Sequence, residues 1–403
     1  MANLTNWQRN IFVFKANSVF SWFQAFIGVW VLIWTHYLNF TQIGIIYSFG
    51  LFWAVLLELP SGALADLIGR RATVLIGRLA SIAGFAVFSV ADNFWLFLVG
   101  NMLYQTNEAF ESGAHSALLY DSLKENGKEN EYYKKTEADT FFYCTIGMVA
   151  GSVIGGFLYN YGAHLPYIAC TLAAIISFVI ALFFQEPVID SEKFTLKNYV
   201  RQNIEGTKHI FENKTIRAIT LFSLVISFIT YTGLWYLYEP RITEAGFDPK
   251  LLGILVAGTY LARAVGIKLI PALDKVLKPH QIPAFLIILQ IAGSVISFIP
   301  GKLAAVTCVY SRKFSDGFRR PILNTLQNDN IISKYRATSL SAISLFTNIL
   351  VATAGPVIGI MIDKYHASIA LGSFAFIGFF VGLPLAMKLA DVIKNKTADE
   401  FPL

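Results

Sequence analysis

Long apolar runs separated by short polar segments dominate the chain. Twelve of these runs are long enough to cross a bilayer as helices, since a transmembrane helix needs about 20 mostly apolar residues. The predicted spans are 11–34, 43–60, 72–91, 94–119, 139–160, 164–185, 216–238, 251–273, 281–299, 302–324, 338–361 and 367–390. Six precede a polar stretch and six follow it. The pattern predicts an all-α polytopic membrane protein with a six-helix bundle at 1–186, a cytoplasmic amphipathic linker at 187–215 and a second six-helix bundle at 216–403.

The two predicted bundles resemble each other in sequence. Residues 151–161 (GSVIGGFLYNY) align without a gap with residues 355–365 (GPVIGIMIDKY), and 355 minus 151 is an offset of 204. At the same offset, Phe-Glu-Ser-Gly at 110–113 aligns with Phe-Ser-Asp-Gly at 314–317. The chain therefore reads as a tandem duplication of a six-helix unit. Repeats related by an axis along the membrane normal, with a site between them near the midplane, are a transporter architecture.

Composition supports a membrane protein and indicates its orientation. Only 14% of the 403 residues are charged and 55% are apolar, whereas soluble domains carry about 25% charged residues. The net charge of +6 comes from basic residues dispersed between apolar runs, so it favours a positive-inside loop bias and no nucleic-acid partner. When loops are assigned alternately to the two sides, this bias places both termini and the linker in the cytoplasm. We expect a multi-pass protein of the plasma membrane.

Residues 62–71 carry the most specific motif in the chain. The segment reads G-A-L-A-D-L-I-G-R-R, with the motif positions occupied by Gly62, Asp66, Gly69, Arg70 and Arg71. It resembles the signature loop of the major facilitator superfamily (MFS), G-x-x-x-D-x-x-G-R-R. In that family the loop latches the two halves on the cytoplasmic side. The resemblance implies the MFS fold of two pseudo-symmetric six-helix bundles and a gating role for these residues.

Glycines also recur in the fifth predicted span. Gly147, Gly151, Gly155 and Gly156 resemble the antiporter motif of the family, G-x-x-x-G-P-x-x-G-G, except that Ser152 replaces the proline. A proline does occur at the symmetric place in the eleventh span, within a second packing motif formed by Gly355, Pro356 and Gly359. The motif favours export, but glycines spaced by four also make a smooth face for helix packing with no ligand. Both readings remain open.

Polar residues inside the spans are the candidate functional groups, because charges are expensive in a bilayer and usually face a cavity or a partner. The fourth span carries a polar stripe at helical spacing, Asn101, Gln105, Glu108 and His115, with Glu111 beside it. Glu108, Glu111 and His115 are candidates for proton coupling. The alternative is structural, with Glu108 satisfied by a neighbouring span.

The tenth span carries a second charged stripe. Arg312 and Asp316 are four residues apart, and Arg312 is the counterpart of Glu108 at the offset of 204. The two could face each other across a central cavity, or Arg312 could simply pair with Asp316 along its own helix. In the family, spans one, four, seven and ten line the cavity. The substrate-cavity candidates are Asn17, Gln24, Asn101, Gln105, Trp235, Arg263, Arg312 and Asp316.

Other charged residues near span ends have simpler interpretations. Arg263 in the eighth span is either a salt-bridge member or an anion contact. Arg78 and Arg319 are expected near cytoplasmic ends, where long basic side chains reach the interface without any function.

These features predict a secondary active transporter that works by alternating access. The chain has no phosphate-binding glycine loop and no apparent catalytic or metal-ligand cluster, and its three cysteines lack paired spacing, so we expect no enzyme activity, cofactor or metal. The preferred function is proton-coupled efflux of small amphipathic molecules by a monomer. The alternative is a symporter or exchanger of a polar or anionic metabolite, which the buried cations favour. A polytopic membrane enzyme and a non-transporting receptor are the remaining rivals.

Overall fold

The computed structural model of the protein describes residues 5–187, 201, 204, 207–208, 210–211, 213–331 and 333–400. Within these residues the secondary structure is helical, with no strand. Most of the predicted linker at 187–215 lies outside the described residues. The chain divides into two compact units, comprising 1–38, 46–196 and 248–257 in unit 1, and 39–45, 197–247 and 258–403 in unit 2.

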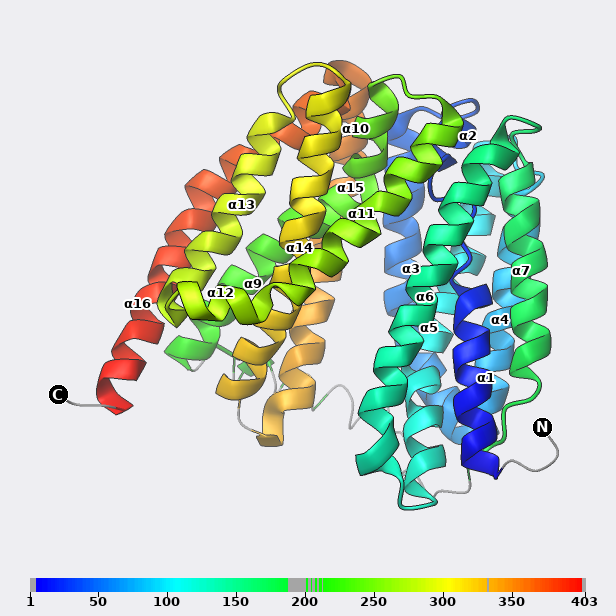
Figure 1. Ribbon diagram of the computed structural model, residues 1–403, viewed down its shortest axis with the longest axis horizontal. Helices are drawn as coiled ribbons and strands as arrows, with labels where there is room; N and C mark the ends of the chain where they lie inside the picture. Colours follow the sequence, from blue (N-terminus) through cyan, green and yellow to red (C-terminus); the bar gives the residue numbers. More distant parts are fainter. Residues whose placement is uncertain are drawn as a thin grey trace. The chain divides into compact units, whose positions relative to one another are not determined.

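Unit 1 is built from seven helices and the start of α11. Their bounds are α1 Asn6–Ser21, α2 Trp30–Trp34, α3 Phe40–Ile68, α4 Arg70–Phe88, α5 Phe94–Lys124, α6 Glu129–Tyr159 and α7 Leu165–Ala181, with the first residues of α3 belonging to unit 2. Helix α4 packs against both α5 and α7, and α1 packs against α5, α6 and α7 (Figure 1). The polar side chains of α1, α4 and α5 are therefore brought to one place.

Unit 2 contains the remaining helices. Their bounds are α9 Lys214–Thr232, η1 Gly233–Leu237, α10 Tyr238–Glu244, α11 Pro249–Lys268, α12 Ile270–Val276, η2 Pro279–Gln281, α13 Ile282–Ile296, α14 Lys302–Asn330, α15 Ser333–Ile377, η3 Gly378–Gly382 and α16 Leu383–Glu400. Helix α14 packs against α9, α10 and α13, and α15 packs against α9, α10 and α13. The charged stripe of α14 thus lies among the helices of its own unit.

Seven helical stretches in the described part of the chain are long and apolar enough to cross a membrane. They are Phe40–Glu58, Arg70–Phe88, Glu129–Tyr159, Lys214–Glu244, Pro249–Lys268, Pro279–Ile296 and Thr338–Asn395. The last covers 58 residues and includes two predicted spans. Helices α1 and α7 are shorter, at 16 and 17 residues, while α5 and α14 carry the charged stripes. The count of twelve spans stays a prediction.

The tandem repeat reappears in the helix bounds. Helix α6 begins at residue 129 and α15 at residue 333, which is the sequence offset of 204. A kink at His366 divides α15, because the residue has φ of 74°, in the left-handed region that breaks a right-handed helix. The break falls between the predicted spans 338–361 and 367–390.

The glycines of α6 allow other backbone segments of unit 1 to approach it closely. A Cβ atom at Gly147 would overlap the carbonyl oxygen of Val19, and one at Gly155 would overlap the carbonyl oxygen of Ala25. A Cβ at Gly151 would lie 2.7 Å from the backbone nitrogen of Gln24, which is also too close. In unit 2, a Cβ at Gly359 would overlap the backbone of Phe40. These contacts are with backbone, which cannot move aside as a flexible side chain can.

Gly155→Ala is accordingly expected to destabilise the protein. Overpacking of a well-filled interior typically costs about 1–3 kcal/mol. Thermal unfolding in detergent, followed by loss of monodisperse protein, measures the effect. Gly162→Ala is the matched control, because the nearest atoms to its new Cβ belong to the flexible side chain of Leu165. Equal melting temperatures for the two variants would refute the close packing at Gly155.

Candidate functional site

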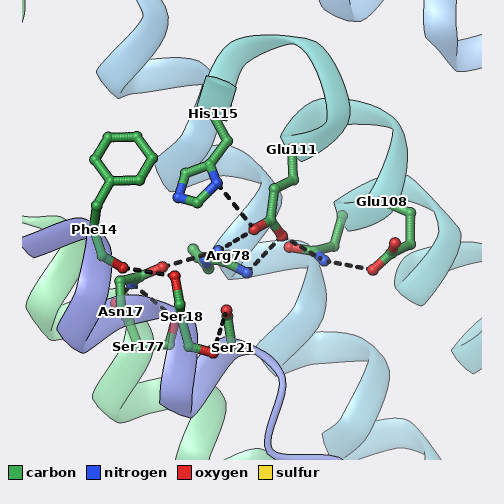
Figure 2. Close-up of polar contacts among 10 residues, drawn as sticks. Phe14, Asn17, Ser18, Ser21, Arg78, Glu108, Glu111, His115 and Ser177 are labelled. Atoms are coloured by element: carbon green, nitrogen blue, oxygen red, sulfur yellow. Dashed lines mark hydrogen bonds and ion pairs between the residues drawn. The ribbon is translucent and has the colours of Figure 1, made fainter. Parts of the chain in front are cut away.

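A buried ion pair forms the centre of the polar cluster in unit 1 (Figure 2). Arg78 on α4 donates to both carboxylate oxygens of Glu111 on α5, at 2.7 Å from Nη1 to Oε2 and 2.5 Å from Nη2 to Oε1. The Arg78 side chain is only 2% exposed and that of Glu111 14%. Two parallel charge-assisted bonds of this kind are strong and fix the geometry of both groups.

Helices α1 and α7 hold the arginine from its other side. Arg78 Nη2 also donates to Asn17 Oδ1 at 2.9 Å. The Asn17 amide in turn donates to the carbonyl and hydroxyl oxygens of Ser177 on α7, at 2.7 and 3.0 Å. Asn17 is fully buried. Its hydrogen bonds join α1, α4 and α7, so this substrate-cavity candidate is placed in a network internal to unit 1.

Glu108 lies one helical turn before Glu111 and has a different environment. The amide of Asn107 donates to Glu108 Oε1 at 3.3 Å and to Glu111 Oε2 at 3.5 Å. Among the described residues, no Lys, Arg or His lies within ion-pair distance of Glu108. The negative charge of Glu111 is balanced by Arg78, whereas that of Glu108 has no such direct partner.

His115 completes the cluster at the next turn of α5. Its Nδ1 lies 3.7 Å from Glu111 Oε1, and its ring packs against Phe14 with centroids 4.3 Å apart. Its Nε2 is buried and accepts or donates no hydrogen bond among the described residues. The structure thus brings the three proton-coupling candidates together along one face of α5.

The expectation that Arg78 reaches the membrane interface is wrong. Its side chain is buried against α1 and α5, and both of its terminal nitrogens donate to Glu111 or Asn17. The sequence pattern missed it because a single arginine near a span end looks the same whether it is solvated or paired. A partner 33 residues away is set by helix packing.

The signature loop is tied to the helices around it. Gly69 has φ of 94°, a conformation that favours glycine, and it separates α3 from α4. The carboxylate of Glu186 accepts the backbone N–H groups of Arg70 and Arg71 at 2.6 and 2.7 Å, which caps the positive end of α4. Arg70 also forms an ion pair with Asp121 on α5 at 2.5 Å.

Glu186 and Asp121 were not among the predicted residues because they lie far from the motif along the chain. The expectations for Gly62 and Asp66 fall on positions whose side chains lie outside the described residues.

The charged stripe of α14 forms a second cluster, in unit 2. Asp316 pairs with Arg319 at 2.7 Å and with Arg263 at 3.2 Å. Arg319 is 3% exposed and also donates to the hydroxyl of Ser227 on α9. The expected interfacial position of Arg319 is therefore wrong, and Arg263 is a salt-bridge member. The proposed helical pair of Arg312 with Asp316 does not form.

Arg312 is fully buried and uses neutral partners instead. It donates to the hydroxyl of Tyr238 at 3.2 Å, to the carbonyl of Ile229 at 2.8 Å and to the hydroxyl of Ser294. Lys313, beside it and 2% exposed, lies over the rings of Tyr238 and Tyr260, with Nζ 5.6 and 5.0 Å from their centroids. Cation–π contacts of this kind stabilise a desolvated ammonium group.

The remaining candidates lie within their units. Gln24 donates to the hydroxyl of Tyr104 at 3.0 Å, and Asn101 donates to the carbonyl of Ile46 at 2.8 Å. Gln105 is buried on α5. Trp235 is half-buried in the π-helical turn η1. Such turns often occur at functional sites.

Ser152, where the antiporter motif has proline, is fully buried and donates to the carbonyl of Gly253 at 2.8 Å within unit 1. Its hydroxyl provides a hydrogen bond that proline has no group to make.

The chain is similar in sequence and in fold to known membrane transporters. The model of the Major Facilitator Superfamily matches residues 14–356. Multidrug resistance protein 2 of Bacillus subtilis (strain 168) is 24% identical over the full length of both chains. The uncharacterized MFS-type transporter YxaM of the same organism is 21% identical, covering 92% of this chain and 94% of that protein. The crystal structure of the nucleoside transporter NupG superposes with a TM-score of 0.73 at 14% identity, over 97% of this chain and 100% of that one. That likeness is one of fold.

Proposed function

The chain belongs to the Major Facilitator Superfamily, which confirms the predicted family and fold, and from this premise we propose that it exports small amphipathic molecules in exchange for protons. As a member of this family it is a multi-pass membrane transporter. In the proposed cycle the protein alternates its access between the two sides of the membrane. Protons entering down their gradient supply the free energy for export.

The observation that carries the proposal is the contrast between the two glutamates of α5. Glu111 is held by two bonds from Arg78, so its charge is already balanced inside unit 1. Within the part of the chain that the structure describes, the polar partner of Glu108 is the Asn107 amide at 3.3 Å. Glu108 is half-buried, and a partly desolvated carboxylate without an ion-pair partner gains from binding either a proton or a positively charged substrate. Competition between the two at Glu108 would couple their movements in opposite directions.

The substrate class rests on relatives as well as on the site. One full-length relative is named multidrug resistance protein 2, and a relative matching 51% of this chain is named tetracycline resistance protein, class B, of Escherichia coli. Half-buried aromatic residues such as Trp235 would suit an amphipathic substrate, since their rings offer large apolar surfaces. These observations support export of small amphipathic molecules as the first choice.

A second candidate function is exchange of a polar or anionic metabolite. The α14 cluster favours it because buried positive groups outnumber buried negative ones there. Arg312, Lys313 and Arg319 are nearly inaccessible, with Arg263 beside them, while the buried carboxylates are Asp316 and Glu239. An organic anion would balance this excess.

Location and gating complete the proposal. We place the transporter in the plasma membrane as a monomer, with both termini in the cytoplasm, because basic residues concentrate in loops on one predicted side. Residues 62–71 would serve as the cytoplasmic gating loop. The ion pair of Arg70 with Asp121 and the Glu186 cap support that role, since they fix the end of the loop to α5 and to the segment that follows α7.

Proton coupling is tested with purified protein in liposomes containing a pH-sensitive dye. Lipophilic cations, organic anions and sugars are added in turn, and the responding class decides between the two candidate functions. Glu108→Gln is expected to reduce substrate-driven proton movement by about 100-fold or more, since its amide cannot exchange a proton. Glu131→Gln, an exposed glutamate paired with Lys128, is the control. Substrate flux that carries no protons, or proton movement unchanged in Glu108→Gln, would contradict the proposal.

A further inference from the structure

A small cavity lies directly beside the Glu111 cluster, between α1, α5 and α6 of unit 1. Its volume is about 170 Å³. The polar residues that line it are His115 and Ser116 on α5 and Glu137, Thr140 and Cys144 on α6. The cavity therefore extends from an exposed carboxylate, Glu137, to the histidine that contacts Glu111.

Two polar atoms on the residues lining this cavity lack hydrogen-bond partners in the described part of the chain. They are His115 Nε2 and Thr140 Oγ1, and both are buried. Buried polar groups in proteins are nearly always satisfied, by protein or by water. A cavity needs only about 10–15 Å³ of water-accessible space to hold one water molecule, and water binds where several polar groups are available. The cavity thus has the size and chemistry to hold a short chain of waters.

We propose that this cavity admits water and that His115 relays protons between that water and Glu111. The inference rests on the proposed function, because the relay brings protons to Glu111, which shares the Asn107 amide with the coupling residue Glu108. A proton that arrives along the water chain as hydronium binds Nε2 of the neutral ring and leaves a water molecule behind. The resulting imidazolium gives its Nδ1 proton to the Glu111 carboxylate, whose Oε1 lies 3.7 Å away. One proton moves and the ring is left neutral in its other tautomer. Histidine suits this role because its two nitrogens can exchange protons near neutral pH.

The surroundings of His115 set the direction in which its ring points. Phe14 packs on its ring at 4.3 Å and orients Nδ1 toward Glu111. On α1, Lys15 is paired with Asp139 of α6 at 2.7 Å. The charged groups on the helices packed against His115 are Lys15 on α1, Arg78 on α4, Glu108 and Glu111 on α5, and Glu137 and Asp139 on α6. Helix α7 contributes no charged side chain there. Glu111 and Glu137 are the two carboxylates next to the path.

Water access is tested directly through Cys144, which lines the cavity. In a chain carrying Cys170→Ala and Cys308→Ala, we expect the water-soluble reagent 2-aminoethyl methanethiosulfonate to label Cys144. The matched control keeps only Cys170, whose side chain is fully buried. Labelling of Cys144 is expected to be about tenfold faster or more, because only a solvated thiol forms the reactive thiolate readily. Equal rates would overturn the proposal that water enters, whatever the protein transports.

The relay itself is tested with His115→Gln. Glutamine keeps a polar N–H donor of similar size beside Glu111, so it preserves a positioning role, but it cannot relay a proton. Substrate-driven proton movement is expected to slow by about tenfold or more, with substrate affinity unchanged. Thr140→Val and Glu137→Gln should slow it by smaller factors, while Thr145→Val and Glu131→Gln on the same helix should not.

The outcomes separate this inference from the proposed function. If the unaltered protein moves protons and His115→Gln does so at the same rate, the relay is refuted and coupling stands. If the unaltered protein moves substrate without protons, the proposed function fails and the relay fails with it. Cys144 labelling reports on water entry in either case.

Discussion

Arg78→Met is expected to destabilise unit 1 severely. Among the described arginine and lysine side chains, only Arg78 lies within ion-pair distance of the Glu111 carboxylate, and the substitution removes it. The substitution also removes the hydrogen-bond donor to Asn17 Oδ1. Breaking a buried ion pair from one side typically costs about 3–5 kcal/mol, because the remaining charge is left uncompensated. The measurement is thermal unfolding in detergent. Arg217→Met, at an exposed arginine of α9, is the control and should change little.

The double variant Arg78→Met/Glu111→Met separates stability from function. Replacing both members of a buried pair by apolar side chains is often neutral for stability. We therefore expect the double variant to regain most of the lost thermal stability while substrate-driven proton movement stays absent. A single variant as stable as the unaltered protein would show that the pair does not contribute as described. A double variant that still couples protons would remove Glu111 from the proposed pathway.

Asp316→Asn is expected to destabilise unit 2 to a comparable extent. The carboxylate balances two guanidinium groups, Arg263 at 3.2 Å and Arg319 at 2.7 Å, and Arg319 is almost completely buried. Asparagine can accept hydrogen bonds but carries no charge, so both arginines would be left without their carboxylate. A loss of about 3–5 kcal/mol is again the expected scale.

Thermal unfolding in detergent tests this expectation too, with Asp391→Asn on the exposed surface of α16 as the control. Asp316→Glu, which keeps the charge, should retain more of the stability than Asp316→Asn. If Asp316→Asn melts at the same temperature as the control, the cluster is not a structural element of unit 2. An unstable Asp316→Asn that organic anions restabilise would instead support the second candidate function.

Much of the architecture was predictable from the order of apolar and polar residues. Helical character, the membrane environment and the transporter family follow from hydrophobic runs and from the signature loop, and all three are confirmed. The 204-residue repeat is visible in the sequence and again in the starts of α6 and α15. The prediction of a transporter in place of an enzyme is likewise confirmed by the family match.

The candidate site was predictable only in part. The stripe of Glu108, Glu111 and His115 was found because residues at steps of three and four share a helix face. Their partners were not, since Arg78 comes from another helix and was expected at the interface. In unit 2, Arg319 was misplaced for the same reason. For both arginines the sequence showed a charged residue in a predicted span, but it did not show which side chain would pair with it.

The sequence by itself determined properties that depend on one helix at a time, namely which segments are apolar enough to span a bilayer and which helix faces are polar. The tertiary structure decided which charges are paired, because Arg78 meets Glu111 across 33 residues and Asn17 meets Ser177 across 160. Such contacts depend on how helices pack, and a shift of a few ångströms between helices would exchange one partner for another. An unpaired charge in a low-dielectric interior has a high free-energy cost. The pairing of charges between helices therefore determines the geometry of the site.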